Sequence, residues 1–211
     1  MASAPNPPNV RTISNFKSAL RGGGARPNLF EVAIPDMPSY VDGGIYGNVD
    51  KSTLRFMCKA ANMPASNVAP VDVPFRGRIL KVAGDRTFDP WTITVINNTD
   101  WALRQTFEDW SNMINNRVYD FGVTQPVEYH TNASVLQLAR NTPAGTGQDQ
   151  TGDSNIPIVS KYKFYGMWPS QVSSVALDYG STDTIEEFQV TFQVEYWNQM
   201  DPKWEEQGKG G

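Results

Sequence analysis

Residues 187–196 read EFQVTFQVEY, a stretch in which apolar and polar side chains alternate at every position. Phe188, Val190 and Phe192 would lie on one face of an extended chain, with Val194 and Tyr196 continuing that face. Successive side chains of a β-strand point to opposite sides of the sheet, so this pattern predicts a half-buried strand. We expect it to extend over residues 184–197.

Other runs rich in β-branched and aromatic residues predict further strands. These are expected at residues 28–34, 53–60, 75–82, 91–97, 133–140 and 158–165, with a weaker one at 172–178. In the second run, alternation of Leu54, Phe56, Cys58 and Ala60 predicts an inward face, which makes Cys58 a core residue.

One segment has a different period. Leu103, Phe107, Trp110 and Ile114 recur at i, i+4, i+7 and i+11, which predicts an amphipathic helix from Thr99-Asp100 to about residue 115. Many strands and one helix of about four turns indicate a mainly β protein. The predicted fold class is an antiparallel β-sandwich or barrel with one packed α-helix.

The ends of the chain differ in composition from its centre. Residues 1–25, rich in Ala, Pro, Asn and Ser and closing in a glycine run at 22–24, are interpreted as an N-terminal arm with a hinge. The arm holds Val10, Ile13, Phe16 and Leu20 at a loosely helical spacing. We expect a β domain over residues 26–197, long loops at 35–51 and 141–157, and a polar C-terminal tail at 198–211.

Composition narrows the class of protein. A chain of 211 residues with 39% apolar residues is long enough for one domain with its own core. One cysteine excludes an internal disulfide, and no apolar run predicts a signal peptide or membrane insertion. Residues 1–100 carry a net charge of +3 and residues 101–211 a net charge of −7. This acidic balance argues against a general DNA-binding domain and is compatible with head-to-tail self-association.

Candidate catalytic chemistry is sparse. His130 is the only histidine, and it lacks the partner motifs of a triad or a zinc site, so we interpret it as a surface or interface residue. We therefore expect no enzymatic activity, no cofactor and no metal. The six tryptophans make a β-sandwich carbohydrate-binding module an alternative class, since aromatic rings can stack on sugars. The dispersed carboxylates make a hydrolase a further alternative.

Four segments resemble a known family. They are Arg26–Phe30, Val82–Asp89 with the following strand at 91–95, Gly166–Pro169, and the closing run at 187–197. In the same order, over about residues 25–197, the sequence resembles the tail tube proteins of contractile-tailed bacteriophages of the T4 type. The arm, the loop at 35–51 and the glycine-rich tail are departures from the family pattern.

The resemblance implies a structural virion protein that forms stacked hexameric rings, the inner tube of a contractile tail and the channel for DNA ejection. The implied partners are further copies of the chain, the tail sheath protein, the tape-measure protein, and the baseplate and tail-terminator proteins, with transient non-specific passage of double-stranded DNA. The implied location is the virion tail, after assembly in the host cytoplasm. If six subunits each give four strands, the barrel closes at a diameter of roughly 45–50 Å.

The expected subunit-interface residues are Val10, Ile13, Phe16, Leu20, Asp85, Arg86, Trp168 and Trp197. Gly84 to Arg86 is interpreted as a turn between two strands. The alternatives left open are a tube subunit of a type VI secretion system or a phage-tail-like particle, a baseplate tube initiator, and, in a different class, the carbohydrate-binding module.

Overall fold

The computed structural model describes residues 12–20, 24–35, 37, 51–119, 121–140 and 158–200. The chain divides into two units, one of residues 1–30, 137–160 and 201–211, the other of residues 31–136 and 161–200. The first unit contains helix α1 (Ile13–Ala19), and the second contains most of the strands. Val10, Gly22, Gly23 and nearly all of both expected long loops lie outside the described residues.

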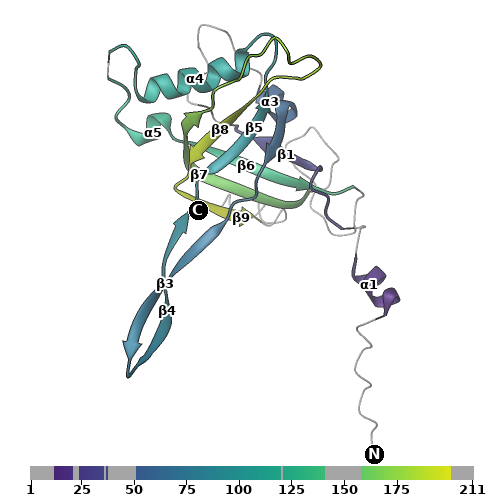
Figure 1. Cartoon of the computed structure of the whole chain (residues 1–211), viewed down its shortest axis with the longest axis vertical. Helices are drawn as coiled ribbons and strands as arrows, with labels where there is room; N and C mark the ends of the chain where they lie inside the picture. The colour runs from purple at the N-terminus through teal and green to yellow at the C-terminus, as the bar shows by residue number, and fades with distance from the viewer. Residues whose placement is uncertain are drawn as a thin grey trace, which may run out of the picture. The chain divides into compact units, whose positions relative to one another are not determined.

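Antiparallel strands dominate the described part of the chain, which confirms the predicted mainly β class. The strands are β1 (Phe30–Ala33), β2 (Cys58–Ala61), β3 (Ser66–Phe75), β4 (Arg78–Phe88), β5 (Trp91–Ile96), β6 (Thr131–Leu138), β7 (Ile158–Val172), β8 (Glu187–Gln193) and β9 (Tyr196–Met200). The other helices are α3 (Lys51–Met57), α4 (Ala102–Ile114) and α5 (Pro126–Tyr129). Seven strands form one sheet in the order β1-β6-β7-β8-β5-β2, with β9 beside β7, while β3 and β4 form a separate hairpin (Figure 1).

A bend in β7 gives the sheet two layers. Residues 161–165 of β7 pair with β9, whereas residues 168–172 pair with β8. Gly166 lies between the two segments at φ +60°, and a Cβ there would approach Glu195 Oε2 to 2.5 Å. Glycine adopts positive φ without strain and leaves room for Glu195, so the chain can pass from β8 to β9 at this corner.

Aromatic side chains fill the space inside the bend. Trp91 of β5 stacks on Phe164 of β7 with ring centroids 4.4 Å apart, and its indole N–H donates to the carbonyl of Asn62 at 2.9 Å. Phe192 lies 5.6 Å from the Trp91 ring and also contacts Phe107 and Trp110 of α4. Both layers and the helix therefore share one core.

The predicted helix is present as α4, and its apolar stripe faces β8. Leu103, Phe107 and Trp110 are buried, as the spacing predicted, while Met113 is buried in place of the half-exposed Ile114. The residue preceding the helix is Trp101, in the left-handed conformation with φ 57°. Asp100 supplies the expected capping contact by accepting from the backbone N–H of Ala102 at 3.1 Å.

The strand predicted over residues 53–60 is wrong in its first half. Residues 51–57 form α3, and only residues 58–61 form a strand. Leu54 and Cys58 are both buried, and a spacing of four fits one helix face, while Phe56 is 82% exposed. Because the run is short, the strand period of two residues and the helix period of 3.6 residues both place Leu54 and Cys58 on one face. Cys58 is a core residue, as predicted.

Other strand boundaries also differ from the predicted ones. The run at 75–82 contains the β3–β4 turn, and β3 itself was not predicted. The weak strand at 172–178 is absent beyond Val172, and the closing run divides into β8 and β9 at the corner beside Gly166. Strand β9 continues to Met200, into the segment expected as a polar tail.

We predict that Phe192→Ala lowers the free energy of unfolding by about 3–5 kcal/mol, because the fully buried ring has aromatic neighbours on β5 and on α4. Phe56→Ala, at an 82% exposed position, should change it by less than about 1 kcal/mol. Urea denaturation of both variants measures the difference. Equal losses would contradict the proposed core.

Candidate subunit interface

The β3–β4 hairpin carries an apolar surface with no cover in the described part of the chain. Val71 pairs with Val82, and Val73 pairs with Leu80. Cross-strand partners share a face, and Phe75 continues it by alternation. We call Val71, Val73, Phe75, Leu80 and Val82 the hairpin apolar face. Its members are 42–67% exposed, an unusual state for large apolar side chains side by side.

The opposite face of the hairpin is more polar. There Asp72 pairs with Lys81, and the Lys81 ammonium lies 3.7 Å from the Asp72 carboxylate. Both residues are exposed, so the pair contributes little to stability. This face also carries Ile79, which is 65% exposed, so the two faces differ in their share of charged residues and the hairpin apolar face is the more apolar one.

Two local features shape the hairpin. Arg76 and Gly77, at φ 44° and 81°, form a two-residue turn of the kind that matches strand twist. Gly84 and Asp85 oppose Ala69 in a β-bulge, where a Cβ on Gly84 would lie 2.7 Å from the Ala69 carbonyl oxygen. The prediction of a turn at Gly84 to Arg86 is thus wrong, because these residues lie inside β4.

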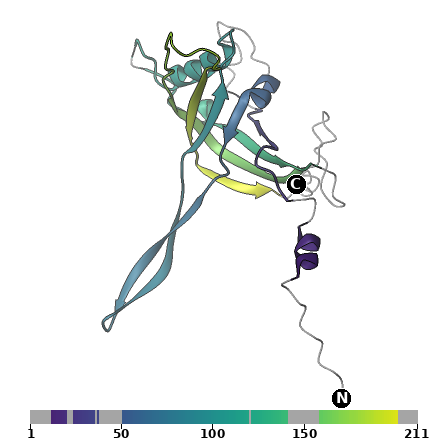
Figure 2. The ribbon, with the colours of Figure 1, turned by 45° about the vertical axis from the view of Figure 1, so that its right-hand side comes forward.

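The hairpin extends the β2–β5 pair of the sheet, and Figures 1 and 2 show it projecting as a ribbon from the second unit. Trp197 of β9 holds its base. The indole N–H of Trp197 donates to the Ala65 carbonyl at 3.2 Å, and its ring meets the edge of Phe88 at 6.1 Å. Asn67 and Asp89 add a 2.8 Å hydrogen bond across the base. The core thereby orients the hairpin.

The predicted interface residues come from different elements. Ile13, Phe16 and Leu20 are exposed on or beside α1, and Val10 lies outside the described residues. Asp85 is exposed in the bulge, and Arg86 donates to Ser66 within the hairpin at 3.0 Å. Trp168 of β7 is half-buried against the edge of Tyr129. Of these residues, the structure brings Trp197 to the hairpin base.

The hairpin apolar face was missed by the sequence analysis. Its signal is the alternation Val71-Asp72-Val73-Pro74-Phe75, which follows Pro70 and contains Pro74. Proline cannot donate to a strand ladder and is confined largely to edge strands. In a two-stranded hairpin both strands are edges, so Pro70 and Pro74 are tolerated here.

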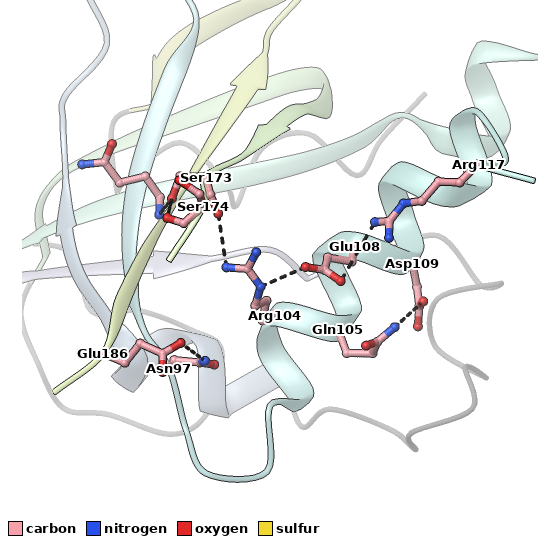
Figure 3. A network of polar contacts seen from close by, with 10 residues as sticks. Asn97, Arg104, Gln105, Glu108, Asp109, Arg117, Ser173, Ser174 and Glu186 are labelled. Carbon is pink, nitrogen blue, oxygen red and sulfur yellow. Dashed lines mark hydrogen bonds and ion pairs between the residues drawn. The ribbon is translucent and has the colours of Figure 1, made fainter. Parts of the chain in front are cut away.

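Several polar side chains on and near α4 form hydrogen bonds and ion pairs (Figure 3). Arg104 donates to Glu108 at 2.9 Å and to the Ser173 carbonyl at 3.2 Å, and its guanidinium lies over the Phe188 ring. Asn97 donates to Glu186 at 2.9 Å. The Arg104 contact joins α4 to the end of β7, and the Asn97 contact joins the end of β5 to the start of β8, so these polar groups stabilise the fold.

The described residues offer little that resembles a catalytic centre. No three His, Cys, Asp or Glu side chains gather among them as metal ligands would. His130 follows α5, where its backbone N–H donates to the Pro126 carbonyl and its ring meets the edge of Tyr129. None of the described helices is long and apolar enough to cross a membrane.

A sequence model of the phage tail tube proteins matches residues 25–200. The chain belongs to the phage tail tube protein family. It is 34% identical to the tail tube protein gp19 of Enterobacteria phage T4 over 176 residues, which cover 83% of this chain and 92% of gp19. It is 28% identical to the tail tube protein of Serratia phage KSP90 over 184 residues, 85% of this chain and 92% of that protein.

A solved structure shares the fold of this tail tube family member. The extended sheath-tube complex of the extracellular contractile injection system PVC contains a chain that matches with a TM-score of 0.51 at 12% identity. The match covers 90% of this chain and 99% of that one. The resemblance to tail tube proteins of contractile-tailed phages is thus confirmed, and the protein is a component of the phage tail.

We predict that Trp197→Ala loosens the hairpin base, because it removes both the bond to Ala65 and the Phe88 contact. Backbone amides of β3 and β4 should exchange with deuterium several-fold faster in the monomer, while those of β5 and β8 keep their rates. Tyr179→Ala, at a fully exposed aromatic position, is the control. Unchanged hairpin exchange in Trp197→Ala would contradict the anchoring role.

Burial raises the pKa of the Cys58 thiol to about 11 from its ordinary value of 9.0. Between these values the unfolded chain loses the proton that the folded chain keeps, so the Cys58 contribution to stability is present below pH 9 and is lost as the pH approaches 11. We predict that wild type loses on the order of 2 kcal/mol more than Cys58→Ala across this range in urea denaturation. Parallel pH profiles would contradict a buried neutral thiol.

Proposed function

We propose that this protein assembles as stacked hexameric rings into the inner tube of a contractile phage tail, the channel for genome ejection. The observation that carries the proposal is the hairpin apolar face, which needs a covering partner. In a self-assembling tube, every copy offers the hairpin and every neighbour offers a surface to receive it. An isolated ribbon with two free edges and one apolar face is otherwise an association hazard.

The free energy expected from burying the hairpin apolar face favours assembly. The five side chains are about half covered in the single chain, so complete burial would contribute roughly 1 kcal/mol for each of them. The core already orders the hairpin through its base, so little further ordering entropy opposes docking. Repeated at each subunit contact, this gain supports a continuous ring.

The face of β5 and β8 that points away from the buried side chains Trp91, Val190 and Phe192 suits a channel wall. It carries Thr92, Thr94, Gln189 and Thr191, and the hydroxyls of Thr92 and Thr191 are hydrogen-bonded at 3.0 Å. The charge of Glu187 on the same face is balanced by its ion pair with Lys59. We propose that this neutral, hydroxyl-rich surface faces the lumen, where the tape-measure protein and then double-stranded DNA reside. Without a surplus of cations, such a wall would let phosphates pass without holding them.

The solved structures that share the fold suggest the remaining partners. The PVC structures are of a sheath-tube complex and of a sheath/tube terminator. For this chain we propose a tail sheath outside the tube, a terminator at one end and a baseplate at the other, with assembly in the host cytoplasm and a purely structural, non-enzymatic role. The 34% identity to the T4 protein supports a phage tail over a secretion-system tube.

We predict that Leu80→Asp abolishes tube formation by placing a charge in the hairpin apolar face. Ile79→Asp is the matched control, since Ile79 is adjacent, similarly exposed at 65% against 61%, and on the opposite face. Light scattering and negative-stain electron microscopy should show tubes for wild type and Ile79→Asp, and monomers for Leu80→Asp. Circular dichroism should show the same β-rich fold in all three.

Two results would contradict this proposal. The first is a wild-type protein that stays monomeric at every concentration tested, which would favour an isolated binding module. The second is normal tube assembly by Leu80→Asp, which would remove the hairpin apolar face from the subunit contact.

A further inference from the structure

The N-terminal helix α1 presents a second uncovered apolar surface. Ile13, Phe16 and Leu20 follow a helical spacing and are 75%, 64% and 46% exposed. Thr12 caps the helix by accepting from the Asn15 N–H at 3.3 Å. A helix of seven residues is too short to be stable by itself in water, so α1 requires a surface on which to dock.

The loop between β7 and β8 offers such a surface. Ten residues between Val175 and Glu187 line an open cavity of about 620 Å³, which is large enough for several side chains. Leu177 and Ile185 lie at this cavity with 81% and 71% of their surfaces exposed, and Tyr179 is fully exposed.

The loop is shaped before anything binds to it. The Gly180 N–H donates to the Asp178 carboxylate at 2.9 Å, and the Ser181 N–H donates to the Asp178 carbonyl at 3.1 Å. At its end, the Asn97 N–H donates to the Glu186 carbonyl at 2.9 Å. Preformed turns lower the entropy that docking would cost.

The two surfaces are opposite in charge. Residues 1–25 contain Arg11, Lys17 and Arg21 and no acidic residue, whereas residues 173–187 contain four acidic residues and no basic one. Glu187 is paired with Lys59 and Glu186 with Asn97. Asp178 and Asp183 form no ion pair with any cation in the described part of the chain.

We propose that α1 of one copy docks in the cavity of the β7–β8 loop of an adjacent copy, with Phe16 beside Leu177 and Ile185, and Lys17 near Asp178. We assign the occupant as α1 of a second copy because its basic and exposed apolar side chains complement the acidic loop and the exposed Leu177 and Ile185. The inference rests on the proposed tube, which supplies the adjacent copy. Exposed apolar groups then select the contact, and opposite charges orient it.

A crosslinking experiment tests the contact directly. A chain carrying Phe16→Cys is co-assembled with a differently tagged chain carrying Leu177→Cys, and the tubes are oxidised. Disulfide-linked heterodimers should form at least tenfold more than with Val127→Cys, which replaces an equally exposed residue on α5. The buried Cys58 remains in all chains and is assayed alone as background.

Charge reversal tests the orientation. Asp178→Lys should lower the temperature at which tubes dissociate by several degrees, and Lys17→Asp in the same chain should restore at least half of that loss. A crosslink confined to one chain carrying both cysteines would overturn docking between copies. So would tubes whose stability is unchanged by deletion of residues 1–24.

Both of those results would leave the tube itself intact, so they are distinguishable from failure of the proposed function. Absence of tubes in the wild-type protein would contradict the proposed function and, with it, this contact.

Discussion

Trp91 makes the contact on which the two layers and the helix depend. Its ring stacks on Phe164 from the first half of β7, and Phe192 lies beside it in the register of β5 and β8. Phe192 in turn contacts Phe107 and Trp110 on α4. Large aromatic rings remove much apolar area from water, so this single cluster joins elements far apart in the chain.

The aromatic core does not cover every apolar surface of the second unit. The β2–β5 pair continues into β3 and β4, where no described element covers the hairpin apolar face. Trp197 anchors the base of the hairpin to β9 and couples its direction to the sheet. A core that carries a hairpin with an exposed apolar face suits the proposed assembly from copies of this chain.

The polar chemistry of the chain serves the same structural purpose. Arg104 bridges α4 to the strand end at Ser173, and Lys59 is paired with Glu187 across the sheet. Burial keeps the Cys58 thiol neutral and unreactive at physiological pH. In this member of the phage tail tube protein family, the polar side chains named above make structural contacts.

By itself, the sequence determined β5, β8, α4 and the tail tube resemblance, because sustained periodicity establishes which side chains share a face. Near Leu54 and Cys58 the run was too short to separate a helix from a strand. Tertiary structure alone decided the bend at Gly166, the bulge at Gly84 and the exposure of the hairpin apolar face. Local pattern does not specify which partner a strand will pair with or whether an apolar face is covered, since both depend on residues distant in the chain.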